Sequence, residues 1–211
     1  MPTEAAPLQI RRQIVEAAER LIADRGLKGA TTRAIAERAG CAEGSIYRYF
    51  PDKHALFMEV VRTSSPEFPA LVDSLLDRAG QGTVRRTLEE VAIAALGFYR
   101  SIMPMAAGAM AERDLLMEQR RHFQETKRGP MHAIGILAGY VRKEQRLGRI
   151  LDRLSADHVA RALLGTCFAQ AFMMDLLGEE AALGTDEQFA REVVRGLMEG
   201  LQPKSAFKTT S

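Results

Sequence analysis

The heptapeptide EGSIYRY, residues 43–49, carries the side chains in this sequence that are best suited to binding chemistry. Tyr47 and Tyr49 each offer a ring and a hydroxyl, and Arg48 between them offers a cation with several N–H donors. Such a set is typical of a surface that contacts phosphates or base edges. Taken alone, the two tyrosines fit half-buried packing rings equally well, so the elements around them must decide.

Two short helices are expected to position these residues. The segments 32–39 and 43–49 each have about two helical turns, and Gly40-Cys41-Ala42 between them forms a tight turn. This is the helix-turn-helix arrangement, whose second helix fits the major groove of DNA. Ile46 and Phe50 lie four residues apart and should face the core together, which leaves the polar side chains of the second helix outward.

Several residues around this turn have a chemical reason to contact DNA. Gly44 has no Cβ and permits close approach to the backbone, and Lys53 stands beside exposed amides at the start of the next helix. From Arg25 to His54 there are six basic residues against three acidic ones, a modest excess that suits a polyanion. The predicted DNA-binding residues are Thr31, Thr32, Arg33, Glu43, Gly44, Ser45, Tyr47, Arg48, Tyr49 and Lys53.

The segment TTRAIAERAGCAEGSIYRYFPDKHALF resembles the DNA-binding part of the tetracycline-repressor (TetR) family, and the likeness extends from about Ile10 to Phe57. The resemblance implies a homodimer whose N-terminal three-helix unit reads a palindromic operator. It also implies a larger C-terminal helical domain that binds a small effector. The implied phosphate contacts are Thr32, Tyr49 and Lys53. The implied base-reading candidates are Arg33, Glu43, Ser45, Tyr47 and Arg48.

Two residues depart from the pattern of that family. Ala42 stands where the family often has serine, so the second short helix lacks a hydroxyl cap worth about 1 kcal/mol. Glu43 places a carboxylate near phosphates, which is unfavourable unless it accepts from a cytosine amino group or pairs with a nearby base. The role of Glu43 is therefore left open at this point.

The hydrophobic periodicity predicts an all-α protein with about nine to ten helices. We expect a three-helix DNA-binding domain at residues 1–52, a ligand-binding and dimerisation domain at residues 53–202, and a flexible tail at residues 203–211. Gly26 should end the first helix, Gly40 should close the second, and Met103-Pro104 should interrupt the chain. The expected helices are 8–24, 32–39, 43–49, 52–62, 70–78, 83–102, 105–126, 130–146, 155–177 and 185–199.

The larger domain is rich in methionine and phenylalanine, which are common in adaptable apolar binding sites. At helical spacing the same residues more often pack in the core than line a ligand pocket. The resemblance to TetR regulators raises the weight of the pocket interpretation. Tyr99, Arg100, His122 and His132 are available as polar groups for such a site. The predicted ligand-binding residues are Phe98, Met103, Met110, Phe123 and Phe172.

The last two predicted helices carry apolar stripes that suit a two-fold helical interface. Small residues on the first of them allow close helix approach, and larger apolar residues recur at a spacing of four on the second. An intramolecular core is the competing interpretation. The predicted dimer-interface residues are Ala162, Gly165, Ala169, Phe189, Val193 and Leu197.

Other classes of function find little support. The four histidines have no metal-ligand spacing, and there is no Gly-rich phosphate loop and no nucleophile with an adjacent base, so we expect no metal, no cofactor and no enzyme. Cys41 and Cys167 make no disulfide framework, and Cys41 fits a small buried hydrophobe better than an oxidation switch. We see no secretion signal and no stretch approaching the roughly 18 apolar residues of a membrane span, and expect a cytoplasmic protein.

The sequence therefore predicts a ligand-responsive regulator that binds double-stranded DNA as a homodimer, most simply a repressor released by a small apolar or amphipathic effector. Activation of a promoter leaves no mark in the sequence that separates it from repression. The leading alternative is a helical ligand-binding or adaptor protein that keeps the fold without binding DNA. An enzyme with an unrecognised site is a second alternative.

Overall fold

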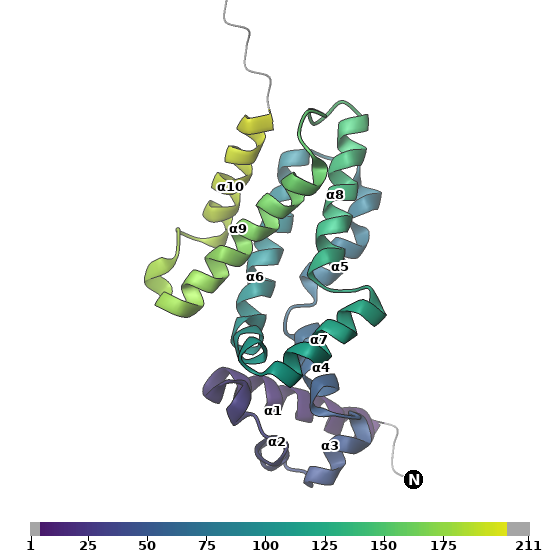
Figure 1. Cartoon of the computed structure of the whole chain (residues 1–211), viewed down its shortest axis with the longest axis vertical. Coiled ribbons are helices and arrows are strands. Elements are labelled where there is room, and N and C mark those ends of the chain that lie inside the picture. Colours follow the sequence, from purple (N-terminus) through teal and green to yellow (C-terminus); the bar gives the residue numbers. More distant parts are fainter. Residues whose placement is uncertain (1–4, 202–211) are drawn as a thin grey trace, which may run out of the picture. The chain divides into compact units, whose positions relative to one another are not determined.

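The computed structural model describes residues 5–201, which form helices joined by turns and loops, with no strand among them (Figure 1). This confirms the all-α prediction. The expected tail at residues 203–211 lies outside the described residues. The helices are α1 (Ala5–Gly29), α2 (Thr32–Ala39), α3 (Glu43–Tyr49), α4 (Lys53–Ser64), α5 (Glu67–Ser74), the 3-10 helix η1 (Leu75–Arg78), α6 (Val84–Ala111), α7 (Arg113–Thr126), α8 (Pro130–Arg146), α9 (Ala156–Leu177), the 3-10 helix η2 (Glu179–Ala181) and α10 (Asp186–Leu201).

The chain packs as two compact units, and α6 contributes to both. The first unit comprises the described residues up to Pro66 together with Arg100–Lys127, and the second comprises Glu67–Tyr99 and the described residues from Arg128 on. Each unit has its own buried apolar residues. These units are defined by packing and not by function. The expected boundary after residue 52, between the DNA-binding and ligand-binding domains, therefore stays a prediction.

The core of the first unit forms where α1 packs against α2, α3 and α4 (Figure 1). Ile14, Ile35, Ile46 and Leu56 supply one fully buried side chain from each of these four helices. Full burial of such a side chain contributes roughly 1.5–3 kcal/mol. The three-helix headpiece is therefore held by α1 at its back, with α4 closing the same core.

In the second unit α8 lies along α9, and α5 and η1 pack on α8 (Figure 1). Four rings gather in this unit, with Tyr99 at their centre. Its ring centroid lies 6.1 Å from Phe68, 5.8 Å from Phe98 and 5.5 Å from Phe168. Burial raises the pKa of the Tyr99 hydroxyl to about 12.

The signals for helix starts and stops mostly act where the sequence places them. Gly26 breaks the helical geometry of α1 with φ 67°, and Gly40 closes α2 in the left-handed conformation with φ 69°. Thr185 and Gln188 form the predicted capping box. The backbone N–H of Gln188 donates to the Thr185 hydroxyl at 3.3 Å, and the backbone N–H of Thr185 donates to Gln188 Oε1 at 2.9 Å.

The predicted interruption at Met103-Pro104 is wrong. Helix α6 continues through Pro104 to Ala111, and the chain breaks only at Glu112. An interior proline costs a helix about 3 kcal/mol because it removes one backbone hydrogen bond. Met103 and Met105 are both buried, so apolar packing on either side of Pro104 offsets that loss.

Two helices, α6 and α9, are long and apolar enough to cross a membrane by length and composition alone. The expectation concerned uncharged stretches, and Arg100 in α6 and Arg161 and Asp175 in α9 keep each helix short of 18 uncharged residues in a row. Core helices of soluble proteins meet the same criterion, and both helices bury one face inside the chain, as Leu88 in α6 and Leu163 in α9 illustrate.

Candidate nucleic-acid interface

Helix α3 separates its residues onto an inward and an outward side, as the sequence predicts. Ile46 is 0% exposed and Phe50, which follows the helix, is 3% exposed. Tyr47 is 53% exposed, and Arg48 is exposed beside it. We call the outward side, formed by Glu43, Gly44, Tyr47 and Arg48, the reading face. Ser45 and Tyr49 lie half-buried at its edges, and Tyr49 packs against the headpiece core.

The turn before α3 matches its predicted chemistry. The Thr31 hydroxyl caps α2 by accepting from the Ala34 N–H at 3.2 Å. Ala42 occupies the cap position of α3 with extended backbone and makes no side-chain cap, as expected from its methyl group. Cys41 is half-buried against the headpiece core, and burial raises the pKa of its thiol, which makes it less reactive.

The structure gives Glu43 a partner that the sequence did not reveal. The Thr32 hydroxyl at the start of α2 donates to Glu43 Oε1 at 2.5 Å, so the carboxylate bridges the first turns of the two short helices. On α2, Arg33 pairs with Glu37 one turn later at 3.1 Å, and both side chains are largely exposed. Exposed pairs of this kind are worth at most about 1 kcal/mol, so Arg33 can exchange Glu37 for another anion at little cost.

The start of α4 follows α3 after a short turn. Asp52 caps it by accepting from the Ala55 N–H at 2.7 Å. Lys53, the first residue of the helix, extends over the ring of Phe57, with Nζ 5.0 Å from the ring centroid. The Phe57 ring thus holds the Lys53 ammonium at the first turn of α4, and Lys53 as a whole is half-buried, so the cation remains close enough to the surface to meet a phosphate.

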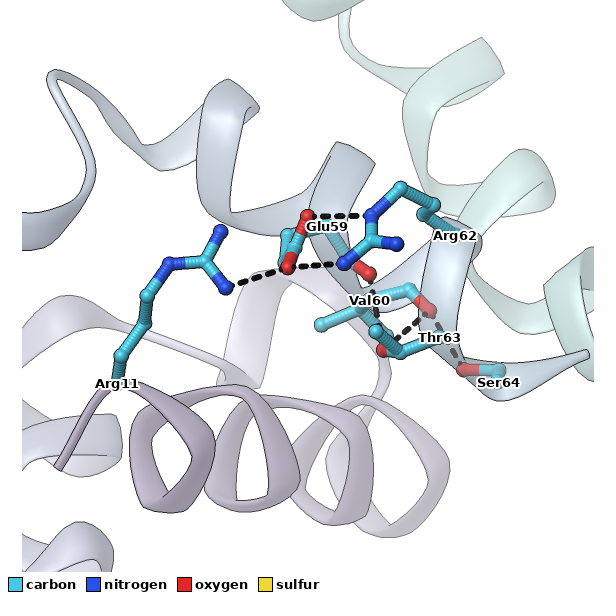
Figure 2. Close-up of polar contacts among 6 residues, drawn as sticks. All are labelled: Arg11, Glu59, Val60, Arg62, Thr63 and Ser64. Atoms are coloured by element: carbon cyan, nitrogen blue, oxygen red, sulfur yellow. Dashed lines mark hydrogen bonds and ion pairs between the residues drawn. The ribbon is translucent and has the colours of Figure 1, made fainter. Parts of the chain in front are cut away.

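An ion-pair network around the largely buried Glu59 ties α1 to α4, and sequence reasoning missed it (Figure 2). Glu59 on α4 accepts from Arg62 at 2.7 and 2.8 Å and from Arg11 on α1 at 2.6 Å. The two hydrogen bonds from Arg62, with the one from Arg11, lower the pKa of Glu59 to about 2 against the opposing effect of burial. Arg11 also lies 5.0 Å from the ring centroid of Phe50. One arginine thus contacts both α4 and the residue that ends α3.

The comparisons with known proteins agree with this geometry. The sequence model of the family described as "Bacterial regulatory proteins, tetR family" matches residues 14–60, which cover most of α1 and all of α2 and α3. Residues 14–60 therefore belong to the DNA-binding domain of the TetR family of transcriptional regulators. This match confirms the predicted recognition segment, and the solved structure described below shares the predicted all-helical architecture.

Relatives in the TetR family resemble this chain over different lengths. The "Uncharacterized HTH-type transcriptional regulator YdgC" of Bacillus subtilis is 26% identical over 199 residues, which is 93% of this chain and 95% of that protein. The "HTH-type transcriptional repressor KstR2" of Mycolicibacterium smegmatis is 40% identical, but over only 60 residues, 28% of this chain and 29% of the repressor. Identity to the named repressor is thus confined to a short segment.

A solved structure shares the fold of the whole chain. The "transcriptional regulator FadR from Bacillus subtilis in complex with stearoyl-CoA" has a TM-score of 0.68 at 19% identity, and the match covers 90% of this chain and 99% of that one. This likeness establishes the TetR architecture of both units. It does not extend to the chemistry of a ligand.

The five residues predicted to bind a ligand are divided between the two units. Phe98 belongs to the ring cluster of the second unit, and Phe172 is 45% exposed on α9. In the first unit Met103 is buried, Met110 is 64% exposed, and Phe123 is half-buried beside His122. A surface hollow of about 410 Å³ involves none of the five, since it is lined by Leu76, Asp77, Ala79, Lys143, Arg146 and Leu147.

The residues predicted for the dimer interface differ in their availability. Ala162, Gly165 and Ala169 are exposed along one side of α9, while Val193 and Leu197 of α10 are half-buried. Phe189 requires a correction. It is 4% exposed within the single chain, because α10 packs this ring against the chain's own core, and it has no surface left for a partner.

Proposed function

We propose that this TetR-family regulator is a homodimeric repressor that binds a palindromic operator through the reading face of α3. One observation carries the proposal: α3 buries Ile46 while it exposes Tyr47 and Arg48. A surface helix that needed only solubility would have little reason to present a tyrosine ring and an arginine side by side. The headpiece is already packed on α1 behind them, so these side chains are available to a partner.

The contacts divide by chemistry. Tyr49 and Lys53 lie at the edge of the reading face and at the start of α4, where a phosphate would meet a hydroxyl and an ammonium. Arg48 and Ser45 are the base-reading candidates on α3, and Arg33 is the candidate on α2. We assign Glu43 to orientation through its hydrogen bond with Thr32, in addition to any contact with a cytosine amino group.

The dimer is proposed to form through α9, with α10 at its edge. The exposed side of α9 combines small residues with large apolar ones: Ala162, Gly165 and Ala169 share it with Phe172 and Leu176, of which Leu176 is 63% exposed. An apolar surface of this extent is typical of a protein-protein interface. A two-fold axis would set two reading faces about 34 Å apart, one turn of DNA.

Release by a small apolar or amphipathic ligand is the regulatory part of the proposal. It is supported by the apolar character of the ring cluster around Tyr99 and by the stearoyl-CoA bound to the FadR of similar fold. We assign DNA binding to residues 1–52 and binding of the ligand and the partner subunit to residues 53–202. We expect the protein to act in the cytoplasm. A ligand that prefers the non-binding conformation by a few kcal/mol is sufficient to release the operator.

The test is a titration of the purified chain against labelled DNA from upstream of its own gene, with a scrambled duplex of equal length as control. If Lys53 is the basic residue of each protomer that meets a phosphate, affinity should fall about tenfold between roughly 50 and 200 mM salt, and further if Arg33 or Arg48 also meets one. Equal binding to both duplexes would reject operator recognition. Absence of binding to either would favour the ligand-binding or adaptor alternative.

A further inference from the structure

Three side chains of types that commonly bind metal ions converge where the start of α4 meets α7, inside the first unit. Asp52, His54 and Glu118 each offer one ligand atom, and these three atoms all lie within 4.8 Å of one another. They come from segments far apart in the sequence, which is why spacing along the chain gave no sign of them. A small closing movement of the side chains would bring all three within about 2 Å of one ion.

The hydrogen bonding of His54 leaves it ready to bind a metal. The ring is 7% exposed, and Nε2 lies 3.2 Å from Gln119 Oε1. An amide oxygen can only accept, so in the neutral ring this contact favours the tautomer with the hydrogen on Nε2 and the lone pair on Nδ1. The amide nitrogen of Gln119 donates in turn to Met58 Sδ at 3.6 Å, which keeps the oxygen directed at His54. Metal-binding histidines usually donate their second N–H to an acceptor in this way.

The two carboxylates also keep ligand capacity. Asp52 uses Oδ1 to cap α4, which leaves its other oxygen available. Glu118 is held by Arg121 at 3.4 Å, an exposed pair that is weak in water and readily exchanged. Two carboxylates together balance the charge of a divalent cation, whereas two carboxylates near each other without one repel.

His122 provides a fourth candidate ligand. It follows Glu118 by four residues, so both side chains project from one face of α7. Its ring centroid lies 5.4 Å from that of His54 in an edge-on arrangement. A set of two imidazoles and two carboxylates from two helices suits a first-row transition metal, because imidazole favours such ions over Mg²⁺ or Ca²⁺.

We propose that this group is a binding site for Zn²⁺ or a similar divalent transition metal, with Asp52, His54 and Glu118 as ligands and His122 completing the set. The ion would join the start of α4, directly after the recognition helix, to α7. Metal binding would therefore regulate the position of the headpiece independently of the organic effector. The competing interpretation is a hydrogen-bonded core histidine beside a capping aspartate.

The site can be tested without DNA. The full chain is stripped with a chelator and titrated with Zn²⁺ by calorimetry, and Co²⁺ is added separately to record its visible spectrum. We expect one saturable site per chain and a Co²⁺ spectrum of a four-coordinate ion with nitrogen and oxygen ligands. Glu118→Gln should abolish the site, and its folding is not at issue because Glu118 is partly exposed. His122→Ala should weaken it.

Two further variants separate a metal role from a structural one. Gln119→Ala should lower Zn²⁺ affinity about tenfold, because it removes the acceptor that orients His54. Glu125→Gln, an exposed carboxylate on the same helix, should leave the affinity unchanged. The proposal would be overturned if the heat of the Zn²⁺ titration showed no saturation. It would also be overturned if the wild type, Glu118→Gln and His54→Ala bound Zn²⁺ at one site with equal affinity. These outcomes do not depend on whether the chain binds an operator.

Discussion

Helix α3 and the α9–α10 pair both present apolar residues at helical spacing, yet their surfaces differ in how far the sequence determines them. In α3 the inward residues are apolar and the outward ones are polar, so each residue type indicates its side. In α9 both sides are apolar: Leu163 is buried and Phe172 is exposed, although both are large hydrophobic residues. The comparison teaches that residue type reveals a polar interface but cannot separate an apolar interface from a core.

The largest expected effect concerns Phe189. Phe189→Ala should destabilise the chain by about 3–5 kcal/mol, because the ring is buried within the chain itself. Phe172→Ala, from the exposed side of α9, should leave the fold intact and shift the equilibrium from dimer toward monomer. Urea unfolding and sedimentation velocity measure the two effects. A stable Phe189→Ala monomer would restore this residue to the interface.

Within α3, Ile46→Ala should cost about 2–5 kcal/mol, whereas Tyr47→Ala should change stability by no more than about 0.5 kcal/mol. The difference arises because one side chain fills the headpiece core and the other stands in solvent. Urea unfolding followed by circular dichroism gives both values. Equal losses from the two variants would mean that Tyr47 is a packing ring, and α3 would lose its reading face.

The ion pairs of Glu59 predict that the stability of the fold depends on pH. The pKa of Glu59 is lowered to about 2, so its ion pairs stabilise the fold above pH 5 and are lost as pH falls toward 2. After allowance for screening of the exposed Arg62, the loss is about 2 kcal/mol. Glu59→Gln should therefore flatten the acid side of a stability-against-pH curve. A variant curve parallel to that of the wild type would argue against the network.

The smallest effect is at the missing cap. Ala42→Ser should stabilise the headpiece by about 0.5–1 kcal/mol, since Ala42 already has the extended backbone of a cap residue and lacks only the hydroxyl. Thr31→Ala, which removes the cap present on α2, should cost a similar amount. Thermal unfolding of the two variants resolves both changes. Destabilisation by serine would show that the turn cannot accommodate the hydroxyl.

Much of the fold followed from the sequence because its signals are local. Helix α8 spans the predicted residues 130–146, with a proline at its start. The capping box at Thr185 and the left-handed Gly40 likewise depend on neighbours within a few residues. The error at Pro104 has the opposite cause, because burial of the adjacent methionines is a tertiary effect that no local rule contains.

The candidate site divides in the same way. Ile46 and Phe50 could be placed inward from their spacing alone, and the exposure of Arg48 follows from theirs. The hydrogen bond from Thr32 to Glu43 joins α2 to α3. The ion pair between Arg11 and Glu59 joins α1 to α4, two helices that α2 and α3 separate in the sequence. Contacts of this kind depend on how helices pack, so the sequence did not predict them.

The most direct test of the account is the affinity of Arg48→Ala for the duplex from upstream of the gene, measured by fluorescence anisotropy beside Arg85→Ala. Both variants remove one exposed arginine, the first from the reading face and the second from the start of α6. The account predicts that Arg48→Ala weakens binding by about 1–3 kcal/mol while Arg85→Ala matches wild type. Equal affinities for wild type and both variants would contradict the claim that the exposed side of α3 contacts DNA.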